Sequence, residues 1–232
     1  MKNYLVAALS CLFFLFVQDS YCQADDSQLG TWYMYMWNKK IPDSQWGVEG
    51  EVQYTDYEIA GDQEWLLIRA AVTYKPKNPN LSFAFGYGHL TFGEIGPEHN
   101  PINENRIYPQ LKMQQKVSER ISFTHRFRLE LRFIEGVDFR SRFRYGLFTN
   151  IPLTNSKLVK NTWFVGLYNE LFLNGERQIG NGREVQYFDQ NRSYAAIGYC
   201  VSDKIRVELG FMRRIAPNRD SNLLQLTMVQ AW

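Results

Sequence analysis

Large apolar residues and charged residues alternate over Ile121–Leu153, and this alternation limits the fold more than any other feature of the sequence. In its first half, Phe or Leu occupies most of the alternate positions, and arginines occupy half of the positions between. After a break at Glu135–Asp138 the pattern resumes. A period of two is typical of β-strands, whose successive side chains point to opposite faces, whereas on a helix these arginines would scatter around the surface. The stretch therefore predicts a hairpin with one apolar and one basic face.

The same alternation recurs in about eleven segments of roughly ten residues, a length that suits a tilted strand crossing a bilayer. Bacterial single-chain barrels have an even number of strands. We therefore expect about ten to twelve strands: ten if the first segment is not a full strand, twelve if one segment is unrecognised. The expected strands cover residues 29–40, 45–57, 64–74, 81–91, 105–117, 121–133, 139–151, 162–173, 192–201, 204–215 and 222–232.

These segments predict an all-β fold, a transmembrane antiparallel up-and-down β-barrel whose apolar faces meet outer-membrane lipid. A soluble periplasmic β-sandwich, with the apolar faces buried against each other, is the competing architecture. The chain is 45% hydrophobic and 16% aromatic, with a formal net charge of +2. This small charge does not indicate a nucleic-acid partner. Beyond the N-terminus no apolar run is long enough for a transmembrane helix.

The N-terminus has the features of a secretory signal peptide, with Lys2 before the apolar run Tyr4–Val17. We expect cleavage before Gln23, which gives a signal peptide over residues 1–22 and one barrel domain over residues 23–232. Lipidation of Cys22 is an alternative, although the bulky Tyr21 precedes it. Export to the bacterial outer membrane is the predicted localisation.

At the other end, alternating apolar residues run to a terminal aromatic, Trp232. Leu224, Leu226 and Met228 share its pattern. This end resembles the closing strand of bacterial outer-membrane barrels, which implies recognition by the barrel-assembly machinery. Cys200 is the one cysteine certain to remain after cleavage, so no internal disulfide is expected.

Several sequence blocks together resemble one protein family. They are GEVQYTDYEIAGDQEWLLIRAAVTY, ENRIYPQ, THRFRLELRFIE, FRSRFRYGLFTNIPL, WFVGLYNELFLN and QNRSYAAIGYCVSDKIRVELGFM. In this order they resemble the DUF2490 family of predicted outer-membrane barrels, which is common in Bacteroidetes-type bacteria. The resemblance covers most of the mature chain and implies a barrel of unassigned function. It brings no catalytic or ligand-binding residues.

If the apolar faces meet lipid, the opposite faces line the lumen with an excess of six positive charges, eleven cations against five acids. Structural filling by Arg–Glu pairs is the main interpretation. A small anion-selective, porin-like channel or an anionic-ligand site is the alternative. The predicted charge network comprises Arg126, Arg128, Glu130, Arg132, Arg140, Arg142, Arg144, Glu170, Arg192, Arg206 and Glu208. Arg69, Lys112, Arg214, Glu49 and Glu51 complete the inward set.

Two further roles remain open. Loops at Phe92–Glu104 and Asn174–Gln190 are long enough for a binding or scaffold function. A barrel hydrolase would need a nucleophile beside a base, but His89, His99 and His125 show no triad spacing. We therefore predict no enzyme activity, no cofactor and no metal.

Local irregularities are also expected. Pro109 lacks a backbone donor, so its strand should bulge or pair imperfectly. The facing of Leu29–Lys40 is undetermined because both of its sides are apolar. In Leu81–Thr91, small residues alternate with aromatics and should leave room for long side chains from other strands.

Overall fold

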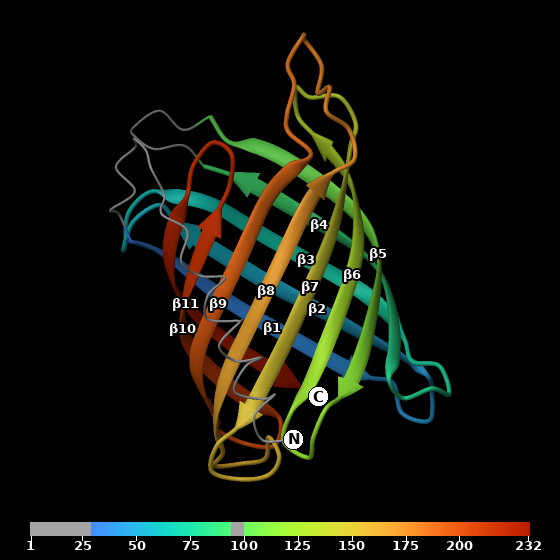
Figure 1. The fold of residues 1–232 in the computed structure, drawn as a ribbon. Helices are drawn as coiled ribbons and strands as arrows, with labels where there is room; N and C mark the ends of the chain where they lie inside the picture. The colour runs from blue at the N-terminus through green and yellow to red at the C-terminus, as the bar shows by residue number, and fades with distance from the viewer. Residues whose placement is uncertain (1–28, 94–99) are drawn as a thin grey trace, which may run out of the picture.

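The computed structural model describes residues 29–93 and 100–232, in which eleven strands close into one barrel (Figure 1). The predicted signal peptide lies outside the described residues. No helix in the described ranges is long and apolar enough to cross a membrane. The strands are β1 (Leu29–Lys40), β2 (Trp46–Asp56), β3 (Gln63–Tyr74), β4 (Leu81–Phe92), β5 (Ile102–Lys116), β6 (Ser122–Ile134), β7 (Arg140–Pro152), β8 (Trp163–Asn174), β9 (Phe188–Cys200), β10 (Ile205–Ile215) and β11 (Ser221–Ala231).

Each strand pairs antiparallel with the next, and β1 closes the barrel against β11 in parallel. The parallel ladder runs from Leu29 opposite Asn222 to Asn38 opposite Ala231. An odd number of strands in an up-and-down sheet leaves the first and last running the same way, so closure must be parallel. The expectation of an even count is wrong, because β1 is a full strand and the described residues hold no twelfth. One closed sheet also excludes the two packed sheets of a sandwich and leaves no exposed edge.

The longest connection, between β8 and β9, lies at one end of the barrel, called here the upper end. It carries the β2–β3, β4–β5, β6–β7, β8–β9 and β10–β11 connections and lies at the top of Figure 1. The β8–β9 loop contains its own bridge between Gln178 and Glu184. At the lower end, the Trp232 N–H donates to the carbonyl of Asn38 at 2.9 Å.

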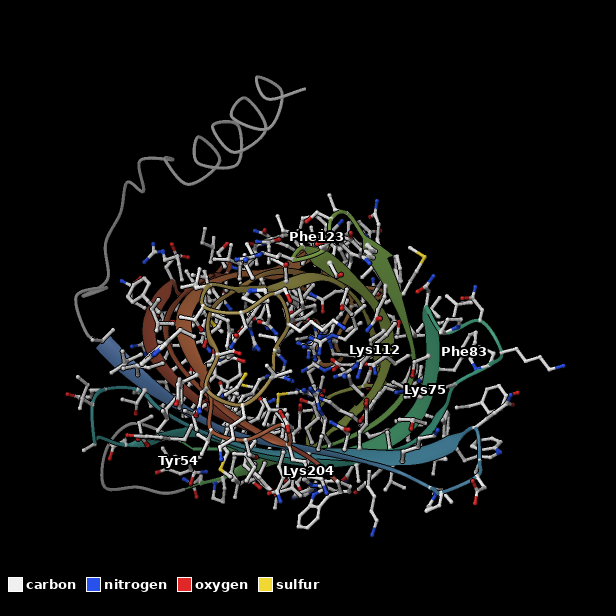
Figure 2. All side chains as sticks on the ribbon, turned by 90° about the horizontal axis from the view of Figure 1, so that it is seen from below. Tyr54, Lys75, Phe83, Lys112, Phe123 and Lys204 are labelled. Carbon is white, nitrogen blue, oxygen red and sulfur yellow. The ribbon has the colours of Figure 1, made fainter. Side chains whose placement is uncertain are left out.

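Alternation places apolar side chains outside and charged side chains inside the barrel. Phe85 is 63% exposed and Leu209 55% exposed, whereas Arg128 and Arg142 are 3% and 5% exposed. Figure 2 shows Phe83 pointing away from the barrel while Lys112 points into it. The face assignment made from the arginine-rich hairpin is therefore confirmed.

Pro109 interrupts one ladder without shifting it. The β4–β5 ladder continues through Pro109, which lies opposite Phe85. The β5–β6 ladder lacks pairs at Tyr108 and Pro109 and then resumes in the same register. The imperfect pairing is confirmed, and it occurs without a bulge.

The inner face of β4 carries small residues, and an aromatic ring occupies the space beside them. A Cβ added at Gly86 would overlap the ring of Tyr108, which is itself 3% exposed. The expected accommodation of long side chains by this strand is therefore confirmed.

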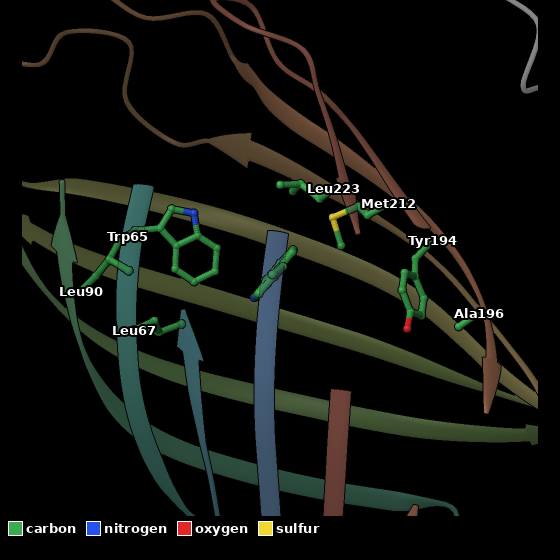
Figure 3. Close-up of a cluster of buried hydrophobic side chains, with 8 residues drawn as sticks. Trp65, Leu67, Leu90, Tyr194, Ala196, Met212 and Leu223 are labelled. Atoms are coloured by element: carbon green, nitrogen blue, oxygen red, sulfur yellow. The ribbon is translucent and has the colours of Figure 1, made fainter. Parts of the chain in front are cut away.

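The undetermined facing of β1 is settled by an apolar cluster inside the barrel (Figure 3). Trp32 points inward, is 2% exposed, and meets Trp65 edge-on at 5.0 Å between ring centroids. The cluster is drawn from β1, β3, β4, β9, β10 and β11, and comprises Trp32, Trp65, Leu67, Leu90, Tyr194, Ala196, Met212 and Leu223. The interior thus has an apolar side, while the arginine-rich side is built by β5–β8.

Candidate functional site

Glu130 is the centre of the charged interior. Its side chain is fully buried, and it accepts hydrogen bonds from Arg142 at 2.9 and 2.6 Å and from Arg144 at 2.5 Å. The guanidinium groups of Arg128 and Arg69 lie 3.7 and 4.0 Å away. The sheet register creates this arrangement, because Glu130 lies opposite Arg142 on β7. One carboxylate therefore neutralises part of four neighbouring cations.

Two further carboxylates are each shared between guanidinium groups. Glu104 binds Arg106 through contacts of 2.6 and 2.8 Å, and Arg132 through contacts of 2.6 and 2.9 Å. Glu170 accepts from Arg126 at 2.7 Å, and from Arg144 at 3.0 and 2.9 Å. Such paired, planar contacts are the strong form of an Arg–carboxylate interaction.

Aromatic rings cover several of the same cations. The guanidinium carbon of Arg144 lies 4.3 Å from the ring centre of Phe172, and that of Arg128 lies 4.4 Å from Tyr108. Both distances are within the range of cation–π attraction. Rings and carboxylates therefore act together on these buried cations.

Every member of the predicted charge network lies in the interior, but the members do not form one cluster. Arg206 and Glu208 pair with each other at 3.4 Å on β10, apart from the β6–β8 network. Arg140 has no carboxylate within 4.0 Å among the described residues and donates instead to Asn174 at 2.7 Å. Arg192 donates to Gln190 at 3.1 Å.

Sequence reasoning missed four interior charges. Arg106 lies two residues after Glu104, but the preceding loop was taken to extend through Glu104. Asp189 falls in the expected loop Asn174–Gln190, but it is the second residue of β9 and binds Arg142 at 2.8 Å. Glu64 has the outward parity of its strand, yet it pairs with Arg214 at the upper rim. Adding the cation Arg106 and the acids Glu64, Glu104 and Asp189 to the inward set lowers its excess of positive charge from six to four.

A cavity of about 870 Å³ opens at the upper end of the barrel, and we call it the vestibule. Nine arginines and three acids are among the residues that line it. The arginines are Arg69, Arg106, Arg132, Arg142, Arg144, Arg177, Arg192, Arg214 and Arg219; the acids are Glu64, Glu184 and Asp189. Arginines thus outnumber acids in the lining, although Glu51, Glu104, Glu130 and Glu170 pair with several of these arginines from behind it.

Smaller cavities continue from the vestibule to the lower end, with volumes of about 260, 170 and 320 Å³. The vestibule and the next cavity share Gln53, Arg69, Arg144 and Arg192 as wall residues. These four side chains lie where the two cavities meet, and we call them the partition. The interior thus holds several cavities along its length.

Two of the histidines considered for catalysis, His89 and His125, lie apart from these cavities. His89 contacts Asn105 at 2.9 Å on the outer face. His125, also outside, lies between the Tyr145 hydroxyl at 2.9 Å and Gln115 at 3.0 Å. His99 falls outside the described residues. Within residues 29–93 and 100–232, no group of three His, Cys, Asp or Glu side chains is placed to hold a metal ion.

Cys200 is a buried thiol at the end of β9. It lies opposite Arg206 in the β9–β10 ladder. Its burial agrees with a packing role for this side chain.

Comparison with known proteins gives one result for the family and none for function. None of the curated proteins matches this sequence significantly. A family model described as a protein of unknown function, DUF2490, matches residues 29–225. The match begins at the first residue of β1 and ends within β11, so it covers nearly the whole barrel. The chain therefore belongs to the DUF2490 family.

Proposed function

We propose that this protein is an integral barrel of the bacterial outer membrane. The observation that carries the proposal is the outer surface, on which each of the eleven strands presents at least one large, exposed apolar side chain. Ile68, Phe85 and Leu209, on three different strands, are all more than half exposed. Soluble monomers rarely expose apolar patches larger than a few hundred Å². Lipid chains would cover this surface without cost.

Export and assembly complete the proposal. The apolar N-terminal run would direct secretion and be removed before Gln23. The barrel-assembly machinery would recognise β11, whose Leu224, Leu226 and Met228 side chains face outward. Lipid is then the main partner of the barrel.

Fractionation tests this proposal directly. The protein should appear in the outer-membrane fraction, resist carbonate extraction, and migrate faster on an unheated gel than after boiling. A mature chain that remains monomeric in buffer without detergent would contradict the proposal.

For the interior, we propose a mainly structural role in which paired charges fill and narrow the lumen. The support is the partition of Gln53, Arg69, Arg144 and Arg192 together with the buried network around Glu130. Small barrels fill their interiors with side chains. In planar bilayers we expect no steady open-pore current. A stable current with anion preference would instead favour the channel alternative.

A second candidate function is capture of small anionic ligands in the vestibule. The specific observation is that two arginines of its lining, Arg192 and Arg219, have no carboxylate of the described residues within 4.0 Å, while the other seven are paired. Guanidinium groups match the geometry of carboxylate and phosphate. Calorimetric titration of the reconstituted barrel with inorganic phosphate and with carboxylates should detect binding that weakens as salt is raised. No binding of either class would refute it.

The β8–β9 loop contributes Arg177 and Glu184 to the same cavity. A binding role of this loop would therefore use the same cavity as anion capture. Replacing residues 176–186 with a short Gly-Ser turn should leave the barrel assembled. Unchanged anion binding after this replacement would show that the loop is not part of the site.

A further inference from the structure

One wall of the vestibule is apolar, although most of its charged lining is basic. Trp65, Leu67, Leu90 and Phe92, from β3 and β4, line the cavity on this side. Trp65, Leu67 and Leu90 belong to the cluster shown in Figure 3, and Phe92 packs against it. Inorganic anions would gain no binding energy from contact with such a wall. The wall offers contact area to the apolar body of a ligand.

Arg192 lies in the partition below this wall, and it differs from the other cations there. Arg69 is paired with Glu51, and Arg144 with two carboxylates. No carboxylate of the described residues lies within 4.0 Å of Arg192, whose Nε donates to Gln190 at 3.1 Å. Arg192 therefore makes no direct ion pair with a described residue, although Glu170 lies opposite it in the β8–β9 ladder.

The surroundings of Arg192 connect it to the apolar wall. Its guanidinium carbon lies 4.8 Å from the ring centre of Trp32 and 4.8 Å from that of Phe172. Trp32 in turn meets Trp65 at 5.0 Å, and Trp65 lines the vestibule. The two rings hold the guanidinium in place and leave its fork available to an acceptor. The structure thus joins a cation that has no direct ion pair among the described residues to one continuous apolar wall.

We propose that the vestibule binds an amphiphilic anion, in which a carboxylate or phosphate group pairs with Arg192 and an apolar body lies along Trp65, Leu67 and Leu90. The ligand supplies the direct ion pair that Arg192 lacks, and its apolar body leaves water by covering the wall. A volume of about 870 Å³ suits a ligand of small-drug size. This inference rests on the second candidate function, anion capture, and specifies the class of ligand.

Binding is measured by calorimetry on the intact barrel in lipid nanodiscs, with empty nanodiscs as the blank. The probes are 2-naphthoate, its neutral amide 2-naphthamide, acetate and inorganic phosphate. We expect naphthoate to bind at least about tenfold more tightly than each of the other three, because it alone has both charge and an apolar body. Tryptophan fluorescence of the barrel should change with naphthoate and with none of the other probes.

Two substitutions test the two halves of the site. Arg192→Gln should weaken naphthoate about tenfold and bring it to the level of the amide. Arg206→Gln is the matched control, because Arg206 is an interior arginine that does not line the vestibule, and naphthoate binding should be unchanged. Leu90→Asn should weaken naphthoate while leaving phosphate unaffected. Each variant is first required to show the gel shift of a folded barrel; Leu67→Asn replaces Leu90→Asn if that variant fails to fold.

The outcomes separate this inference from anion capture. If phosphate, acetate and naphthoate bind equally and Leu90→Asn has no effect, the vestibule captures anions without an apolar subsite. Anion capture then stands, and the inference of an amphiphilic ligand is overturned. If naphthamide binds as well as naphthoate, the anionic group is irrelevant and the inference is wrong. If no probe binds, anion capture fails together with it.

Discussion

Removal of the central carboxylate should weaken the barrel more than any change to its surface charges. Glu130→Gln keeps the size and shape of the side chain and deletes one charge. Arg142 and Arg144, which bind Glu130 at 2.6 and 2.5 Å, would remain buried at 6% and 5% side-chain exposure. Loss of one partner of a buried ion pair typically costs about 3–5 kcal/mol.

The expected value lies at the lower end of that range. Arg142 retains Asp189 at 2.8 Å, and Arg144 retains Glu170 at 2.9 Å. We therefore expect a loss of about 3 kcal/mol in the free energy of unfolding. Glu184→Gln is the control, because the Arg177–Glu184 pair is 51% and 54% exposed. Exposed pairs contribute only about 0–1 kcal/mol.

The measurement is equilibrium unfolding in urea of the barrel in lipid vesicles, followed by tryptophan fluorescence. The midpoint of Glu130→Gln should shift to lower urea with an unchanged slope, while that of Glu184→Gln should not move. In the double variant Glu130→Gln/Arg142→Gln the losses should not add, because the two residues form one network. A midpoint for Glu130→Gln within error of the control would refute the role given to this network.

Three further outcomes follow from the packing. Leu209→Arg, near the middle of β10, should destabilise the inserted barrel by about 2–4 kcal/mol. Its control, Val201→Arg in the β9–β10 turn, should be close to neutral. Equal urea midpoints for the two variants would contradict lipid contact at Leu209. Gly86→Ala should cost about 1–3 kcal/mol through overlap with Tyr108. That cost should shrink in a Tyr108→Ala background, and a full cost there in the same urea assay would show that the ring is not its cause.

The sequence predicts which face of most strands is polar, and the structure agrees at Phe85, Leu209, Arg128 and Arg142. A period of two carries this information directly. It carries none for β1, where Trp32 and its neighbours are apolar on both sides. The inward position of Trp32 depends on partners such as Trp65, which are distant in sequence.

The features that sequence reasoning could not reach are those fixed by closure and by the ends of strands. The parallel β1–β11 pair exists because the count is odd. Glu104 and Asp189 lie near the ends of β5 and β9, where a polar residue of a strand cannot be told from one of the adjoining loop. Arg192 has no direct ion pair among the described residues because its cross-strand neighbour Glu170 binds Arg126 and Arg144 instead. Alternation therefore predicts the faces, and closure of the sheet determines the site.

Accessibility of labelled side chains tests the central claim, that the apolar faces contact lipid. Spin labels are placed at Ile68→Cys and Phe85→Cys on the outer face, and at Ile59→Cys in the β2–β3 turn, in a Cys200→Ser background. In lipid vesicles the first two labels should collide often with oxygen and rarely with a water-soluble nickel chelate, while the turn label should show the reverse. Nickel collisions as frequent at Ile68→Cys and Phe85→Cys as at Ile59→Cys would place these faces in water and contradict the account.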